Sequence, residues 1–406
     1  MRLQSVSRSF KKISLLAYGA IVALVLQGCS SIDSIIIPER GVKTAPASPS
    51  LYSIQEPARF TVNKLPDGWS AVSWSNLPGW SDDAVEEAWQ AFIRGCPSLQ
   101  RQPSWKKICD DGQDIALHPI IVRRFIEERF TPYQHASMSS ASGLMTGYYE
   151  PFFEGSRQKN ARFRYPLFAT PSDLVRVKPQ AKTPGSRMRR DASGRLLPYW
   201  TREDIELGRA RSSLAGKEIV YLENPIEVFI AQVQGSVRIR LNEGGEIRLG
   251  YADANGYPYK SIGKFMIEQG WLPANQASML SIRTWLEKNS DKYVSVMAAN
   301  PSYIFFRELS HLTADSGPLG SLGIPLTPMR SIAVDPNFVP LGSMVYLASK
   351  TPEKQALQRL VVAQDVGSAI QGVQRADFFW GSGEHAGELA GRSKQPLSLW
   401  VLWPRL

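Results

Sequence analysis

The sequence predicts a mainly β protein that also carries several helices. Glycine and proline are frequent, with 31 and 28 residues in a chain of 406, and they separate many short runs of β type. In the clearest runs, residues 237–241 and 246–250, apolar and charged residues alternate. The intervening segment 242–245 has the sequence NEGG, which predicts a hairpin loop. A chain of this length supports two or three domains.

Two helices are predicted ahead of the β-rich part. The first opens at residues 81–83, carries apolar residues on one side up to Ile93, and is expected to end at Gly95. The second starts near Pro119 and stops before Thr131. Two further helices are expected at 261–269 and 276–288, and residues 397–403 form a strand-like run near the C-terminus.

The N-terminus has the features of a bacterial lipoprotein signal. A basic segment ends at Lys12, an apolar run of about 14 residues follows, and LQGC at 26–29 ends it. We expect residues 1–28 to be removed and Cys29 to be lipidated, followed by a flexible tether to residue 57. The alternatives are an ordinary secretory signal and a transmembrane anchor, for which the apolar run is short. Ser30, a non-acidic residue after the cysteine, favours sorting to the outer membrane, on its periplasmic face.

Charge and motif content narrow the function classes. The net charge is +10, and four of the basic residues lie in the signal segment. The remaining mild basic bias favours an anionic polymer such as cell-wall glycan, membrane headgroups or nucleic acid. There is no dense basic helix that would favour nucleic acid.

The four histidines are scattered without an HExxH pair and no GxSxG motif occurs. Neither a zinc hydrolase nor a serine hydrolase is therefore supported, and no metal or cofactor is implied.

Two cysteines remain in the body of the chain, Cys96 and Cys109. An oxidising periplasm would permit a disulfide across this short loop. Two buried free thiols are the alternative, and zinc is disfavoured because no histidine lies at ligand spacing.

Three aspartates near the C-terminus carry the strongest chemical signal. Asp365 directly follows the strand-like run 360–363, Asp377 precedes the aromatic segment FFWG at 378–381, and Asp335 lies upstream in 332–342. Acids at strand ends beside aromatic residues and glycines are typical of a carboxylate site in a sugar-binding groove. The alternative for each is an aspartate that caps a turn.

The segment around these aspartates resembles the C-terminal module of the membrane-bound lytic murein transglycosylase A family. Further similar segments lie upstream in family order: TGYYEP at 146–151, YPL at 165–167, IAQVQGS at 230–236, ADANGYPY at 252–259, NPSY at 300–303 and GIPLTP at 323–328. Together they extend from about residue 140 to residue 395, which is most of the chain after the signal.

The resemblance implies a double-psi β-barrel catalytic domain with an inserted second β-barrel domain and a substrate groove between them. In this chain we expect residues 58–145 to be the N-terminal helical part of the catalytic domain. Residues 146–300 would be the inserted substrate-binding domain, and residues 301–406 would complete the double-psi barrel with its three aspartates.

The resemblance also implies an activity: cleavage of the β-1,4 bond between N-acetylmuramic acid and N-acetylglucosamine in peptidoglycan, with formation of 1,6-anhydromuramic ends. One acid suffices when the muramoyl C6 hydroxyl attacks its own C1, because the nucleophile is intramolecular. Asp377 matches the catalytic aspartate, Asp365 a supporting one, and Asp335 a more peripheral one. The alternatives are a peptidoglycan hydrolase that uses water, and a non-catalytic glycan-binding scaffold lipoprotein.

Other residues are expected to bind the glycan. Tyr148 and Tyr149 suit stacking on sugar faces, with packing between domains as the alternative. Gln232, Gln234 and Ser236 would face one way if residues 232–236 form a strand, and a solvated strand face is the alternative. Thr146 and Ser321 match groove-lining positions of the family, whereas Glu150 is interpreted as structural or substrate-contacting. The expected partners are glycan strands, the outer membrane through Cys29, and cell-wall synthase or scaffold proteins.

Overall fold

The computed structural model describes residues 65–100, 103–139, 143–177, 187–274, 278–313 and 315–405. The predicted lipoprotein signal, Cys29 and the tether lie outside the described residues. Within the described ranges, every helix is too short or too polar to cross a membrane.

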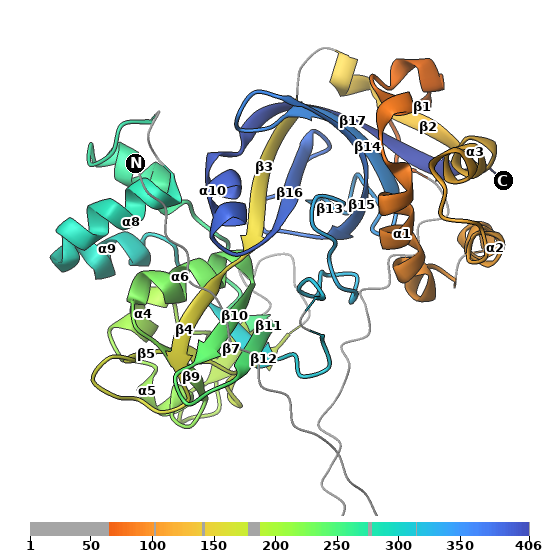
Figure 1. Ribbon diagram of the computed structural model, residues 1–406. Helices are drawn as coiled ribbons and strands as arrows, with labels where there is room; N and C mark the ends of the chain where they lie inside the picture. The colour runs from red at the N-terminus through yellow and green to blue at the C-terminus, as the bar shows by residue number, and fades with distance from the viewer. Residues whose placement is uncertain are drawn as a thin grey trace, which may run out of the picture. The chain divides into compact units, whose positions relative to one another are not determined.

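Three helices precede the β-rich part: α1 (Val85–Leu99), α2 (Pro103–Gly112) and α3 (Pro119–Arg129). α1 buries an apolar face that includes Trp89 and Phe92, and it packs against β15 of the main sheet (Figure 1). The predicted end at Gly95 is wrong, because the helix continues to Leu99. Gly95 instead allows close packing, since a Cβ there would lie 3.3 Å from Ile324. The sulfur atoms of Cys96 and Cys109 are bonded and join α1 to α2.

An eight-stranded sheet, here called sheet A, contains the predicted aspartates. Its outer strand β3 also pairs with β17, so β17, β14, β15, β13, β16 and β3 form a closed ring of hydrogen-bonded neighbours (Figure 1). α10 (Glu384–Arg392) packs on β3 and β16. In pairing order the strands of sheet A are β1 (Trp69–Ala71), β2 (Phe130–His135), β17 (Lys394–Pro404), β14 (Met344–Lys350), β15 (Ala356–Asp365), β13 (Ser331–Val334), β16 (Arg375–Ser382) and β3 (Gly143–Glu150).

A six-stranded sheet, here called sheet B, is built from the middle of the chain. The predicted hairpin is confirmed, with β10 antiparallel to β11 and Arg238 opposite Arg248. In pairing order its strands are β12 (Ile304–Glu308), β11 (Glu246–Ala254), β10 (Ser236–Leu241), β4 (Phe152–Ser156), β9 (Glu218–Leu222) and β5 (Tyr165–Phe168).

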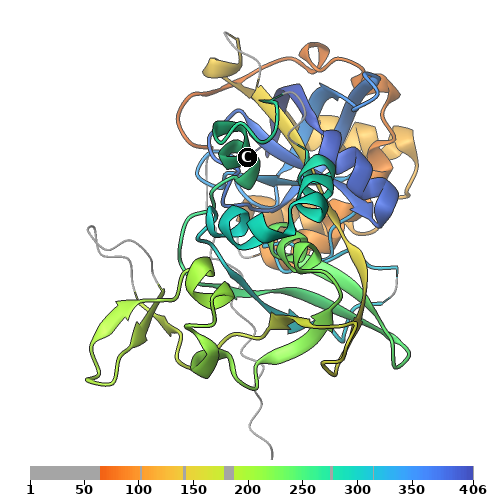
Figure 2. The ribbon, with the colours of Figure 1, turned by 90° about the vertical axis from the view of Figure 1, so that its left-hand side faces the viewer.

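A small third sheet and six helices complete the middle of the chain. Figure 2 shows the small sheet in yellow-green, away from the blue strands of sheet A. The helix predicted at 261–269 is confirmed as α7, and the one predicted from Gln276 is helical from Met279. The elements are β6 (Val175–Arg176), β7 (Arg187–Arg190), β8 (Leu196–Pro198), α4 (Arg202–Glu206), α5 (Arg211–Leu214), α6 (Pro225–Gln234), α7 (Ile262–Glu268), α8 (Met279–Lys288) and α9 (Tyr293–Ala298).

The predicted strand at 232–236 is wrong, because these residues span the end of α6 and the start of β10. Asn224 caps α6 by accepting a hydrogen bond from the N–H of Ile226, and Pro225 occupies its first turn. Gly235 ends the helix with a left-handed φ of 74°. An alternating run of five residues does not by itself distinguish a strand from a buried helix. Gln232, Gln234 and Ser236 therefore do not form one polar strand face.

A buried carboxylate holds the chain where β3 ends and β4 of sheet B begins. The Glu150 side chain is fully buried, and it accepts hydrogen bonds from Arg238 Nε at 2.7 Å and Arg248 Nη2 at 3.0 Å. Ser382 Oγ, at the end of β16, donates to the same carboxylate at 2.9 Å. Two of the arginines of the β10–β11 hairpin, Arg238 and Arg248, therefore bind a carboxylate inside the protein. The third, Arg240, lies over the ring of Phe152.

We predict that Glu150→Gln lowers the free energy of unfolding by about 3–5 kcal/mol, because it leaves the buried guanidinium group of Arg248 and the partly buried one of Arg238 without their carboxylate. Chemical denaturation followed by circular dichroism measures the change. Glu154→Gln is the matched control: Glu154 is an exposed partner of Arg162, so its change should stay within about 1 kcal/mol. Equal losses in the two variants would contradict a structural role for Glu150.

Candidate active site

The strand register of sheet A brings Asp377 and Asp365 to the same part of the sheet. β13 lies between the strands that carry them, and Ala333 of β13 is the register partner of both aspartates. Because neighbouring strands lie about 4.8 Å apart, two strand spacings separate the two backbones by roughly 10 Å. The two carboxyl groups lie close enough for the charge of Asp365 to act on Asp377.

Asp377 lies opposite Thr146 on the parallel strand β3. The Thr146 hydroxyl donates a hydrogen bond to Asp377 Oδ1, and Arg375 Nη2 donates to the Thr146 oxygen at 2.8 Å. Burial raises the pKa of Asp377 to about 6, and the charge of Asp365 adds to this rise, while the Thr146 hydrogen bond and the charge of Arg375 oppose it. Near neutral pH, a carboxyl group with this pKa is still protonated in part of the molecules, and a general acid must be protonated to act.

Asp365 occupies a more polar environment. Its Oδ1 accepts hydrogen bonds from the backbone N–H of Ser321 at 2.9 Å, from the Ser321 hydroxyl at 2.8 Å and from the N–H of Val366 at 2.9 Å. The pKa of Asp365 lies above its ordinary value because burial outweighs these donors, which oppose the rise by stabilising the ionised form. Ser321, which the family resemblance predicts to line the groove, therefore forms hydrogen bonds to Asp365.

The two predicted tyrosines point to different surroundings, as adjacent residues of a strand do. Tyr148 is buried, and its ring lies 5.2 Å from that of Phe379. Its hydroxyl interacts with Asp365 without the geometry of a full hydrogen bond, and burial together with the charges of Asp365 and Asp377 raises the pKa of Tyr148. Tyr149 packs against α10, where a Cβ at Gly387 would lie 2.8 Å from its ring.

The remaining predicted site residues serve local structure. Asp335 directly follows β13, accepts hydrogen bonds from Asn337, and accepts one from the N–H of Gly372 at 2.7 Å. It therefore fastens the loop between β15 and β16. Gln234 accepts a hydrogen bond from the N–H of Tyr149 at 3.1 Å and so holds the end of β3.

Gln232 and Ser236 are also buried, with 3% and 6% of their surfaces exposed. Gln232 lies beside the Tyr303 hydroxyl in the core of the middle segment. These positions suit packing between α6, β10 and their neighbours.

Sequence reasoning missed Arg375. The available signal was its position two residues before Asp377, which places both side chains on one face of a strand. In the described part of the chain, no group of three or more His, Cys, Asp or Glu side chains is arranged to hold a metal ion.

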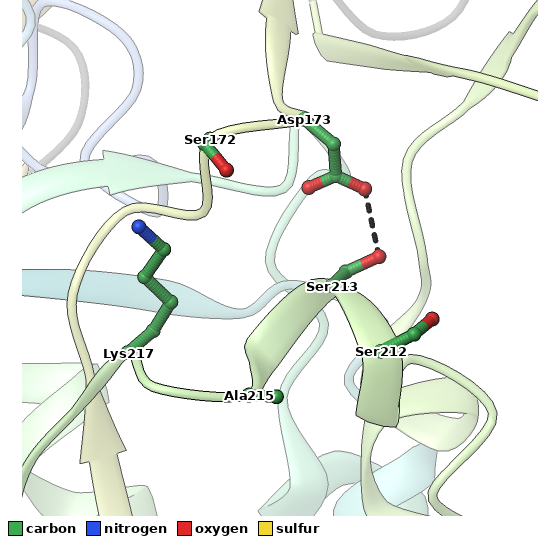
Figure 3. Close-up of a pocket in the computed structure, with 6 residues that line it drawn as sticks. All are labelled: Ser172, Asp173, Ser212, Ser213, Ala215 and Lys217. Carbon is green, nitrogen blue, oxygen red and sulfur yellow. Dashed lines mark hydrogen bonds between the residues drawn. The ribbon is translucent and has the colours of Figure 1, made fainter.

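A polar hollow of about 280 Å³ lies apart from Asp365 and Asp377. It is lined by Ser172, Asp173, Ser212, Ser213, Ala215 and Lys217 (Figure 3). The Ser213 hydroxyl donates to Asp173 at 2.7 Å, and the Tyr199 hydroxyl donates to the other oxygen of Asp173 at 3.0 Å. Both oxygens of this carboxylate are thus used to connect neighbouring segments of the fold.

Two family models match the chain. The MltA specific insert domain matches residues 144–307, and the 3D domain matches residues 330–403. The second match contains all three predicted aspartates. These two modules, in this order, define the class of protein: a 3D-domain protein that carries an MltA-specific insert.

Solved structures and curated relatives agree with this class. MltA from Neisseria gonorrhoeae is 35% identical, with a TM-score of 0.73 over 84% of this chain and 94% of that one. A membrane-bound lytic murein transglycosylase from Agrobacterium tumefaciens is 28% identical, with a TM-score of 0.74 over 83% of this chain and 98% of that one. Membrane-bound lytic murein transglycosylase A of Escherichia coli K12 is 31% identical over 63% of this chain and 64% of its own length.

The chain belongs to the membrane-bound lytic murein transglycosylase A family. The matched part spans 64–65% of the length of the curated relatives. The mainly β architecture with helices is the fold of this family.

We predict that Asp377→Asn changes how stability depends on pH. In the folded protein the pKa of Asp377 is about 6, so its carboxyl keeps the proton to a higher pH than an ordinary aspartic acid with a pKa of 3.8. The folded state therefore binds more protons between these values, and its free energy of unfolding falls as pH rises through them. The free energy of unfolding of the Asn variant does not fall in this way. Between pH 4 and pH 7 the difference in unfolding free energy between the variant and the unchanged protein should therefore shift by roughly 2–3 kcal/mol in favour of the variant.

Denaturant titrations at several pH values measure this difference. Asp110→Asn, at an exposed aspartate paired with Lys106, is the control and should follow the pH dependence of the unchanged protein. Parallel stability curves for Asp377→Asn and the unchanged protein would show that the folded state does not hold this proton.

Proposed function

We propose that this chain is a lytic transglycosylase that cleaves the β-1,4 bond between N-acetylmuramic acid and N-acetylglucosamine in peptidoglycan and leaves 1,6-anhydromuramic ends. The observation that carries this proposal is Asp377, a carboxyl group whose burial raises its pKa to about 6 in the matched 3D domain. The names of the matched relatives, lytic murein transglycosylases, supply the substrate class.

The reaction needs one proton carrier. Asp377 donates its proton to the glycosidic oxygen while the bond from that oxygen to muramoyl C1 breaks, and positive charge develops at C1. The Asp377 carboxylate then accepts the proton of the C6 hydroxyl as O6 bonds to C1. The carboxyl is regenerated and no water is consumed, because the nucleophile belongs to the substrate.

Asp365 supports this site as a negative charge rather than as a second proton carrier. Three donors converge on its Oδ1 and stabilise its ionised form. The charge of Asp365 raises the pKa of Asp377 and would also stabilise the positive charge that develops at C1.

We also propose the finer architecture that the family resemblance implies. The closed ring of strands in sheet A would be the double-psi β-barrel, and sheet B the barrel of an inserted domain, with the glycan in a groove between them. The expected boundary at residue 146 lies close to the start of the matched insert at residue 144. The match continues to residue 307 and sheet B includes β12 (Ile304–Glu308), so the inserted domain would extend a few residues beyond the expected boundary at residue 300. Lipidation of Cys29, the periplasmic face of the outer membrane, and synthase or scaffold partners remain predictions.

We predict that the protein releases anhydromuropeptides from purified peptidoglycan sacculi, and that Asp377→Asn lowers the rate about 10²- to 10⁴-fold by removing the general acid. Mass spectrometry of the released fragments identifies the product ends. Asp191→Asn, in an exposed turn after β7, is the matched control and should keep the full rate.

Two results would contradict the proposal. Reducing-end products would indicate a hydrolase, with water as the nucleophile. Binding to sacculi without any release would indicate a glycan-binding scaffold.

A further inference from the structure

Arg375 and Asp377 lie on one face of β16, because they are two residues apart in a strand. β3 runs parallel to β16, with Leu144 beside Arg375 and Thr146 beside Asp377. The register therefore places the Thr146 hydroxyl between the guanidinium group and the carboxyl group.

The Arg375 guanidinium is held by oxygen atoms of both strands. Nη1 donates to the carbonyl oxygen of Ala376 at 2.8 Å and to that of Leu144 at 3.3 Å, and Nη2 donates to Thr146 Oγ1 at 2.8 Å. These three acceptors are uncharged and belong to β16 and β3. The guanidinium group is thus fixed in place by the two strands that form the site.

The direction of the Thr146 hydroxyl follows from the donor capacity of its neighbours. A guanidinium group has five N–H donors and no acceptor, whereas a threonine hydroxyl has a single hydrogen. Thr146 Oγ1 accepts a hydrogen bond from Arg375 Nη2 and donates its one hydrogen to Asp377 Oδ1. An oxygen that accepts this hydrogen bond is a poor position for the carboxyl proton, which leaves Oδ2.

We infer that Arg375 is a positioning residue that fixes the direction of the Thr146 hydroxyl and thereby restricts the transferable proton of Asp377 to Oδ2. The inference rests on the proposed function, because it concerns the acid of that reaction. Arg375 acts through Thr146 and does not itself contact the glycosidic bond. It differs from a purely structural residue because its effect depends on the threonine hydroxyl.

This arrangement suits an acid that must also accept a proton within one turnover. Burial and the charge of Asp365 favour the protonated form of Asp377, whereas the Thr146 hydrogen bond and the charge of Arg375 favour the ionised form. The other titratable group that faces the site is the Tyr148 hydroxyl. Removing Arg375 therefore raises the pKa of Asp377, so that the carboxyl releases its proton less readily.

A double-mutant cycle tests the connection between Arg375 and Thr146. Arg375→Met, Thr146→Val and the double variant are compared with the unchanged protein by the rate of anhydromuropeptide release on the acidic plateau of the pH profile, where Asp377 is protonated. Each single variant should lose about 10-fold in kcat, equivalent to one charge-assisted hydrogen bond. The double variant should lose little more than either single variant.

Three further results belong to the same experiment. Thr146→Ser keeps a hydroxyl and should restore kcat nearly to that of the unchanged protein. The alkaline limb of the pH profile should move to higher pH in Arg375→Met and Thr146→Val. Arg195→Met, at an exposed arginine paired with Asp191, is the matched control and should change neither quantity.

Losses that multiply in the double variant would overturn the inference, since they would show that Arg375 acts independently of Thr146. An unchanged kcat in Arg375→Met would do the same. Neutron crystallography of the unchanged protein at acidic pH supplies a readout without activity. Deuterium on Asp377 Oδ2, with the Thr146 deuterium directed to Oδ1, is the expected result, and deuterium on Oδ1 contradicts it.

This readout separates the inference from the proposed function. A protein that shows the expected deuterium positions but releases reducing ends has the Arg375–Thr146–Asp377 arrangement and a different reaction. A protein that releases anhydro ends but shows multiplying losses has the reaction without this arrangement.

Discussion

The buried carboxylate of Glu150 is the interaction on which the rest of the site depends. It ends β3, the strand that brings Thr146 and Tyr148 to the aspartates, and it is held by two arginines of the β10–β11 hairpin and by Ser382 at the end of β16. Because β3 and β16 are fastened at this end, their parallel register is fixed. That register decides that a hydroxyl group, and not an apolar side chain, lies beside Asp377.

The pKa of Asp377 results from opposing effects, of which burial is the largest. Burial makes this acid weaker than a solvent-exposed aspartic acid. The Thr146 hydroxyl and the Arg375 charge stabilise the ionised form of Asp377, whereas the negative charge of Asp365 stabilises the protonated form. In the proposed reaction, the resulting pKa of about 6 would let one carboxyl group both give and take a proton, which suffices when the nucleophile is intramolecular. The remainder of the fold holds these four groups together.

Local patterns in the sequence predicted those features that local physics decides. The hairpin at 237–250, the start of α3 at Pro119 and the last strand follow from alternation, a first-turn proline and a β-branched and aromatic run. Gly95 and residues 232–236 were misassigned because a glycine in close packing and a short alternating run each have two local interpretations. The family resemblance identified Asp377, Asp365 and Thr146. Arg375 was missed, because its contact with Thr146 depends on register between strands far apart in sequence.

The most direct test of the central claim is cleavage of sacculi in water enriched in ¹⁸O, with mass spectrometry of the released muropeptides. We expect anhydromuramic products that contain no ¹⁸O, because in the proposed reaction O6 of the sugar and not water attacks C1. One ¹⁸O atom at the new muramic end of each cleaved bond would contradict it and would assign the nucleophile to water.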